Sequence, residues 1–134
     1  MVVEAELFEI RINEVEAEQL IILVEKGGDR RLPIVIGLCE ANAIQIHVHG
    51  VLPPRPLTHD LLSNTIASLG GVIERIVVSD LREGTYYAEL IVRQNGEEVA
   101  IDARPSDAVA LAVRAGCPIF IEEAVLDKSQ VEGL

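Results

Sequence analysis

Two short stretches of this sequence carry the side chains whose types and spacing could do chemistry. Both place carboxylates beside arginine and hydroxyl groups within about one turn of chain, and one adds a histidine. The first stretch contributes Asp102, Arg104, Ser106 and Asp107. The second contributes Arg55, Thr58, His59 and Asp60. Together, carboxylates, guanidinium groups and an imidazole would serve metal-assisted phosphodiester hydrolysis.

The carboxylates and the histidine form the predicted catalytic set. Asp60, Asp102 and Asp107 offer hard oxygen ligands for a divalent metal ion, Mg²⁺ or Mn²⁺, which takes its remaining ligands from water and substrate phosphate. The imidazole of His59 has a pKa suited to proton transfer near neutral pH. We therefore predict that these four residues act on the substrate and that the three aspartates hold the metal.

The arginines and hydroxyls form the predicted substrate-binding set. Arg55 and Arg104 can grip phosphate oxygens with paired N–H donors. Thr58 and Ser106 lie beside them in the sequence and complete the set.

Helix capping explains several of these residues equally well. Thr58 and Ser106 are good N-cap residues, and Pro105 suits the first position of a helix. Asp60 and Asp107 would then lie at the positive ends of the helix dipoles. Cap signatures are common and neither stretch is a specific catalytic motif, so spacing alone favours the capping interpretation.

An internal repeat indicates the elements that must position these residues. A shift of 67 residues, half of the chain, aligns the stretch from Leu32 with the stretch from Val99 without a gap, and places Glu40 on Asp107 and Ile44 on Leu111. We predict an α+β fold in which residues 1–134 form a single domain. Two hairpin–strand–helix units, at about 3–50 and 72–120, would share one mixed, largely antiparallel sheet, with a helix at about 58–70 inserted between them.

Local patterns predict the individual elements. Strands are expected at 3–12, 19–25, 32–36, 72–79, 85–94, 98–102 and 117–122, and an acidic turn at 13–18. Residues 40–49 alternate like a strand, but their repeat partner is Ala-rich, so we predict a helix there. A turn is expected at 80–84, and a fraying helix or tail at 124–134. Pro33 suggests a strand at the edge of the sheet.

Composition restricts the classes of partner. Eleven Lys and Arg against 22 Asp and Glu give a net charge of −11, which excludes a basic surface as the main means of binding nucleic acid. Only four aromatic residues are present, which excludes base stacking in the same role. The N-terminal residues lack a signal pattern, and no apolar run approaches membrane-spanning length. We expect a cytoplasmic protein with no membrane partner, and the positive mean hydropathy favours a homodimer or larger homo-oligomer.

The remaining cysteines and histidines do not indicate a site. Cys39 and Cys117 have no secretory context, so they predict neither a disulfide framework nor a thiolate metal centre. His47 and His49 would point to different sides of a helix and could not chelate one ion together.

Four segments carry a resemblance to a known family. They are LPIVIG (32–37), RPLTHDLL (55–62), LGG (69–71) and DARPSDAVALAVR (102–114). In these segments, and from about Glu4 to Leu126, the chain resembles the bifunctional nuclease domain family of small bacterial and plant domains. The resemblance implies an α+β fold, nuclease activity toward both DNA and RNA, and hence a nucleic acid substrate.

Two functional hypotheses remain. One is a metal-assisted nuclease that uses the residues above. The alternative is a non-catalytic oligomeric module that binds a ligand or a protein, which the acidic balance and the capping interpretation favour. Convergence of the two stretches in space would distinguish them.

Overall fold

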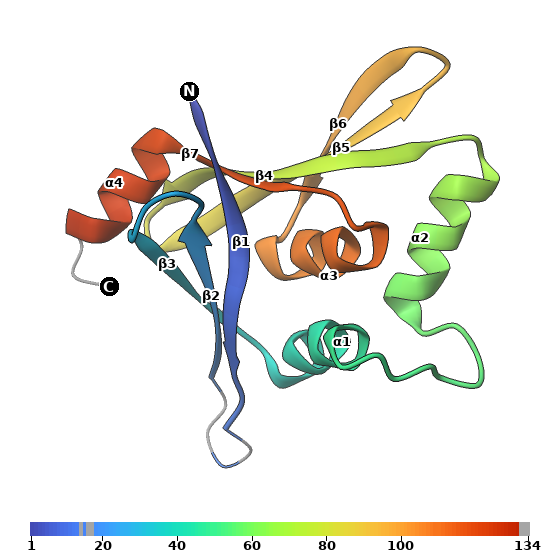
Figure 1. The fold of residues 1–134 in the computed structure, drawn as a ribbon, viewed down its shortest axis with the longest axis horizontal. Helices are drawn as coiled ribbons and strands as arrows, with labels where there is room; N and C mark the ends of the chain where they lie inside the picture. The colour runs from blue at the N-terminus through green and yellow to red at the C-terminus, as the bar shows by residue number, and fades with distance from the viewer. Residues whose placement is uncertain (14, 16–17, 132–134) are drawn as a thin grey trace.

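The computed structural model describes residues 1–13, 15 and 18–131, and within them seven strands form one sheet (Figure 1). The strands are β1 (Val2–Arg11), β2 (Gln19–Glu25), β3 (Arg31–Ile36), β4 (Val72–Arg82), β5 (Thr85–Gln94), β6 (Glu97–Ala103) and β7 (Ile119–Glu122). Their order across the sheet is β3-β2-β1-β7-β4-β5-β6. Only the β4–β7 pair is parallel among these neighbours. The predicted α+β class with a mixed, largely antiparallel sheet is therefore confirmed.

Four helices accompany the sheet in the described residues. They are α1 (Leu38–Val48), α2 (Thr58–Ser68), α3 (Pro105–Ala115) and α4 (Glu123–Val131). The helix predicted at 40–49 is confirmed, and the alternative of a strand there is wrong. None of the described helices is both long enough and apolar enough to span a membrane.

The two halves of the chain present their elements in the same order. Three strands and a helix, β1-β2-β3-α1, are followed after α2 by β4-β5-β6-α3. The bounds of α1 and α3 lie 67 residues apart at both ends, which is the shift found in the sequence. That the two units superpose as hairpin, strand and helix stays a prediction, which a comparison of their backbones would test.

Tight turns set the registers of the hairpins. Asn95 and Gly96 between β5 and β6 have φ of 53° and 79°. Positive φ at both positions is what a type I′ turn requires, and its twist matches that of the flanking strands. Pro33 lies in β3 at the edge of the sheet, as expected, where its missing N–H faces no neighbouring strand.

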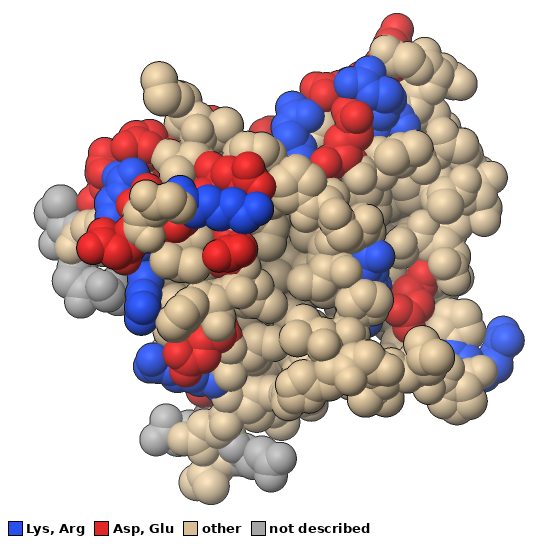
Figure 2. Space-filling model, in the orientation of Figure 1, with Lys and Arg blue, Asp and Glu red and all other residues tan. Residues whose placement is uncertain are grey.

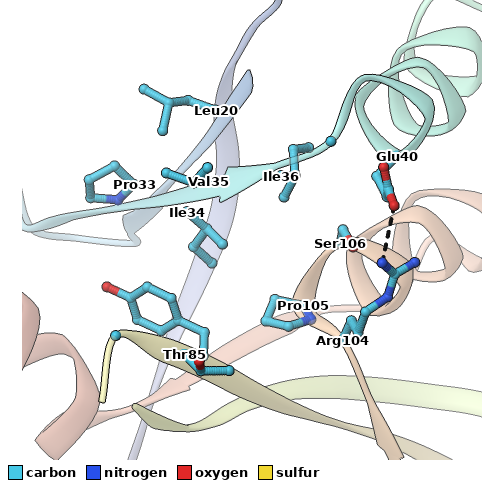
Figure 3. A pocket seen from close by; sticks show the side chains of 13 residues that line it. Leu20, Pro33, Ile34, Val35, Ile36, Glu40, Thr85, Arg104, Pro105 and Ser106 are labelled. Carbon is cyan, nitrogen blue, oxygen red and sulfur yellow. Dashed lines mark hydrogen bonds and ion pairs between the residues drawn. The ribbon is translucent and has the colours of Figure 1, made fainter. Parts of the chain in front are cut away.

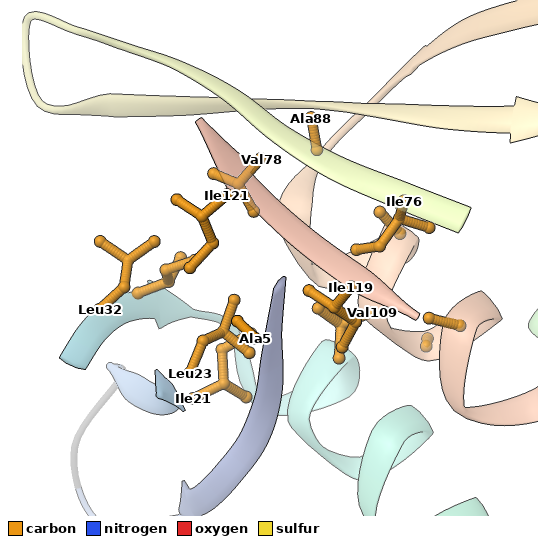
Figure 4. Packing of buried hydrophobic residues seen from close by; sticks show 14 of the residues in the cluster. Ala5, Ile21, Leu23, Leu32, Ile76, Val78, Ala88, Val109, Ile119 and Ile121 are labelled. Atoms are coloured by element: carbon orange, nitrogen blue, oxygen red, sulfur yellow. The ribbon is translucent and has the colours of Figure 1, made fainter. Parts of the chain in front are cut away.

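The core is aliphatic and lies between the sheet and α3. Figure 4 shows Ile21, Leu23, Val78 and Ile121 projecting from neighbouring strands into one cluster with Val109 of α3. Alanines at 108, 110 and 112 are also buried, which lets α3 approach α1 and the sheet closely. Helix α3 contacts α1, α2, β4 and β5, so it is the element through which α1 and α2 are positioned on the sheet.

Several boundaries differ from the prediction. Strand β4 continues to Arg82 because Asp80 and Leu81 still pair with β5, so the turn is limited to Glu83 and Gly84. Strand β7 begins at Ile119 rather than at residue 117. The C-terminal segment is a helix to residue 131 that packs on β3, β4 and β7. Residues 14, 16 and 17 of the predicted acidic turn, and 132–134, lie outside the described residues.

Candidate functional site

The first turns of α1, α2 and α3 meet beside a pocket of about 800 Å³. Its walls combine apolar side chains of α1, α2 and β6 with polar groups from the start of each helix. The polar lining residues are Glu40, Asn42, Thr58, His59, Asp102, Arg104 and Asp107. The structure therefore brings five of the eight predicted site residues to one pocket, from segments more than 40 residues apart.

A chain of hydrogen bonds links four of these side chains. His59 Nε2 lies 2.8 Å from Asp107 Oδ1, and Arg104 Nε donates to Asp107 Oδ2 at 2.8 Å. Arg104 also donates from a terminal nitrogen to Glu40 Oε2 at 3.0 Å. Arg104 and Asp107 both belong to the start of α3, whereas His59 lies in α2 and Glu40 in α1. The contacts of His59 and Glu40 therefore form only when the three helices are packed.

The His59–Asp107 contact determines which imidazole nitrogen can act as a base. A carboxylate only accepts hydrogen bonds, so Nε2 carries the hydrogen that this contact requires. In neutral imidazole the other nitrogen, Nδ1, then holds a free lone pair. The side chain of His59 is 15% exposed, so the ring is held in place but can still meet a substrate. This is the arrangement by which a carboxylate orients a general base.

Asp107 stays ionised in this half-buried position. Burial alone would raise its pKa, but hydrogen bonds from Arg104 and His59 outweigh that effect and hold the pKa of the carboxyl below its usual value. Its negative charge is thus available to stabilise a proton on His59.

Asp60 lies outside this chain of contacts, although it is next to His59 in sequence. Its Oδ1 accepts from Arg114 Nε at 2.7 Å, and its Oδ2 accepts from the backbone N–H of Leu57 at 2.9 Å. The Arg114 hydrogen bond, followed by that of Leu57, lowers the pKa of Asp60. Both oxygens are therefore committed to structural contacts.

The three aspartates are not arranged around one point, as the predicted metal site requires. Within the described residues, no group of three or more His, Cys, Asp and Glu side chains is arranged to hold a metal ion. Asp60 is tied to Arg114, and both oxygens of Asp107 receive hydrogen bonds, while Asp102 is exposed at the pocket wall. Of the three aspartates, Asp102 is the one whose carboxylate makes no hydrogen bond or ion pair within the described residues.

The predicted N-caps are wrong by one and two residues. Helix α2 is capped at Leu57, whose N–H is taken by Asp60, and Thr58 is already helical. Helix α3 is capped at Arg104, because Pro105 with its fixed φ occupies the first helical position and leaves Ser106 inside the helix. Neither hydroxyl makes a capping hydrogen bond, so capping explains Asp60 but not Thr58 or Ser106.

Arg55 and Ser106 line other cavities. Ser106 lies at the wall of a second cavity of about 680 Å³, between the β3 edge and the β4–β5 turn (Figure 3). Glu40 and Arg104 line this cavity as well as the larger pocket, so their ion pair lies where the two adjoin. Arg55 lines a smaller pocket on the α1–α2 connection.

Sequence reasoning missed two residues of the site. Glu40 was detectable, because the repeat aligns it with Asp107 and the two carboxylates share Arg104. Arg114 had no local signal: its side chain is 4% exposed and also donates to the carbonyls of Ala110 and Ala43, which joins α3 to α1 and α2.

A family model covers all of these elements except β1 and the start of β2. A protein-family model of the bifunctional nuclease domain matches residues 21–133. An uncharacterised protein of Mycobacterium tuberculosis is 48% identical over 123 residues, which make up 92% of this chain and 73% of that protein.

Plant relatives match at lower identity. Bifunctional nuclease 1 of Oryza sativa subsp. japonica is 22% identical over 120 residues, or 87% of this chain and 36% of the rice protein. Bifunctional nuclease 2 of Arabidopsis thaliana is 25% identical over 107 residues, or 78% of this chain and 32% of the relative. The chain thus spans about a third of these plant proteins. Since the family model includes Glu40, His59, Arg104 and Asp107 within its match, the residues that build the pocket lie inside the shared domain, and the chain belongs to the bifunctional nuclease domain family.

Proposed function

We propose that this protein is a nuclease that hydrolyses phosphodiester bonds of DNA and RNA at the pocket formed by the first turns of α1, α2 and α3. The observation that carries the proposal is the 2.8 Å contact of His59 with Asp107 in a pocket that also contains Arg104. The family and the names of the plant relatives support the same activity.

Each side chain has a role in the proposed reaction. His59 Nδ1 takes a proton from water as the water oxygen bonds to phosphorus, and Asp107 stabilises the imidazolium that results. The bond from phosphorus to the leaving sugar oxygen breaks, and that oxygen takes a proton from solvent. Arg104 offers its remaining N–H groups to the negative charge that grows on the phosphate oxygens. Asp102 and Thr58, both exposed and lining the same pocket, contact the substrate or its water shell.

The charge balance of the pocket is the reason for including a divalent metal ion in the proposal. Glu40 and Asp107 contribute two negative charges against the single positive charge of Arg104. A phosphodiester would therefore meet a net negative site. Because the aspartates form no preassembled set, Mg²⁺ or Mn²⁺ would enter together with the substrate phosphate.

Cleavage by the purified protein should depend on a divalent ion. We expect single-stranded DNA and RNA to be cut with Mg²⁺ or Mn²⁺ and to stay intact in EDTA, as followed on denaturing gels. The same preparation of the His59→Ala variant controls for contaminating nucleases. Equal cleavage in EDTA would contradict the proposed dependence on a metal ion. Substrate that stays intact under all conditions would contradict the nuclease activity itself.

An oligomeric binding module is the second candidate, favoured by one observation. Helix α2 has no buried residue, although it carries Leu61 and Leu62. Strand β6, which lines the same pocket, exposes Val99 and Ile101. Exposed apolar surface of this kind is typical of an interface.

We expect a homodimer or larger homo-oligomer at micromolar concentration. Burial of the exposed α2 and β6 side chains in a second copy would supply the driving force. Light scattering coupled to size exclusion measures the mass directly. A monomer would contradict this expectation, and Leu61→Glu should shift the oligomer toward monomer while Glu83→Gln, on the distant β4–β5 turn, should not.

A further inference from the structure

A small pocket on the connection between α1 and α2 has no role in the chemistry proposed above. It measures about 280 Å³ and is bounded by the end of α1, the proline-rich connection and one side of α2. Its polar lining residues are His47, Arg55, Asp60, Asn64 and Arg114. In a chain with a net charge of −11, the concentration of cationic and N–H donor groups here is unusual.

Arg55 supplies the unbalanced charge of this pocket. Asp60 and Arg114 neutralise each other at 2.7 Å. Arg55 has no hydrogen bond, ion pair or ring contact within residues 1–13, 15 and 18–131, and every other lysine and arginine there has at least one of these. The pocket therefore holds one guanidinium group whose donors are all open to a ligand.

The backbone around Arg55 restricts the positions that its guanidinium group can reach. Pro53, Pro54 and Pro56 surround it, and each ring fixes its own φ. A stiff connection reduces the entropy that the arginine loses when it binds. In Figure 2 the blue atoms over this connection are bordered by uncharged surface, whereas those near the sheet lie against red.

The small pocket adjoins the candidate active site. Leu57, Thr58 and His59 line the larger pocket, while the flanking residues Pro56 and Asp60 line the small one. Ile46 of α1 lines both. The first turn of α2 thus separates the two, and a polynucleotide that enters one can continue across that turn into the other.

We propose that the small pocket is a phosphate-binding subsite, in which Arg55, assisted by the N–H donors of His47 and Asn64, holds a backbone phosphate of the nucleic acid next to the one being cleaved. The proposal rests on the nuclease function proposed above. Arginine suits this task because its planar group donates two parallel hydrogen bonds to a phosphate.

Equilibrium binding tests the subsite separately from cleavage. The His59→Ala protein, whose cleavage we expect to be slow, is titrated in Mg²⁺ against a fluorescein-labelled single-stranded DNA 12-mer, and anisotropy is read at several salt concentrations. Adding Arg55→Ala should weaken binding about tenfold, as for the loss of a charge-assisted hydrogen bond. It should also reduce the slope of log K against log salt by about 0.7, the value for one phosphate contact on a single strand.

Two further variants separate the contact from its charge. Arg55→Lys should keep the slope and recover part of the affinity. Arg82→Ala removes the same charge from an exposed ion pair with Asp80 on β4, and should leave both quantities unchanged. Equal effects of Arg55→Ala and Arg82→Ala would overturn the subsite. If wild-type protein still cleaves in that case, the nuclease proposal survives. A wild-type protein that neither binds nor cleaves overturns both proposals.

Discussion

His59→Ala should lower the rate of DNA and RNA cleavage at least tenfold while the protein stays folded. The variant loses the nitrogen that we propose accepts the proton from water, and general bases contribute about a hundredfold to ten-thousandfold to such rates. The side chain lies at a pocket wall rather than in the core, so its loss should not unfold the domain. Initial rates on a labelled oligonucleotide give the effect, and circular dichroism checks the fold.

Matched variants show whether the loss is specific. Asp107→Asn keeps the shape of the side chain but removes the charge that stabilises imidazolium, and should also cost at least tenfold. Asp102→Asn should do the same if Asp102 meets the substrate or a metal. His49→Ala, at an exposed histidine beyond α1, should retain full activity. If the folded variants of His59 and Asp107 cleave like wild type, the binding module becomes the better hypothesis.

The second large effect concerns stability. Arg114→Met should lower the free energy of unfolding by about 3 kcal/mol, because it leaves Asp60 and the carbonyls of Ala43 and Ala110 without their donor. The methionine fills much of the same volume, so the cost reflects the lost donor rather than a cavity. Urea unfolding measures it.

The control is an arginine that forms ion pairs at the surface. Arg93→Met breaks contacts with Glu74 and Glu98 on the sheet, where the arginine side chain is 44% exposed, and should cost less than about 1 kcal/mol. Equal losses for the two variants would show that Arg114 is no more than another surface charge.

The Asp60 pair adds a pH dependence with a defined sign. Because folding lowers the pKa of Asp60, its contribution to stability is fully present above the carboxyl's ordinary pKa of about 4. That contribution is lost as the pH falls through the lower, folded value. The stability gap between wild type and Asp60→Asn should therefore be largest near neutral pH and close in acid.

The sequence by itself determined the local elements. Strand β5 was predicted at its observed bounds, because alternation depends on neighbours in the chain. The helix at α1 was recovered only through the repeat, since its own pattern alternates like a strand. Residue types also identified His59, Arg104 and Asp107 as candidates. Apart from α1, the determining interactions lie within a few residues.

Only the tertiary structure decided which candidates act together. Asp60 and His59 are adjacent in sequence, yet Asp60 bonds to Arg114 and His59 bonds to Asp107. Successive helical positions point about 100° apart, so the two side chains meet different neighbours. Glu40 joins the site through Arg104, which lies 64 residues away in the chain, and Arg114 bridges three helices. These pairings depend on how α1, α2 and α3 pack on one another, and that arrangement is fixed by burial of the aliphatic core rather than by any pattern local to the site.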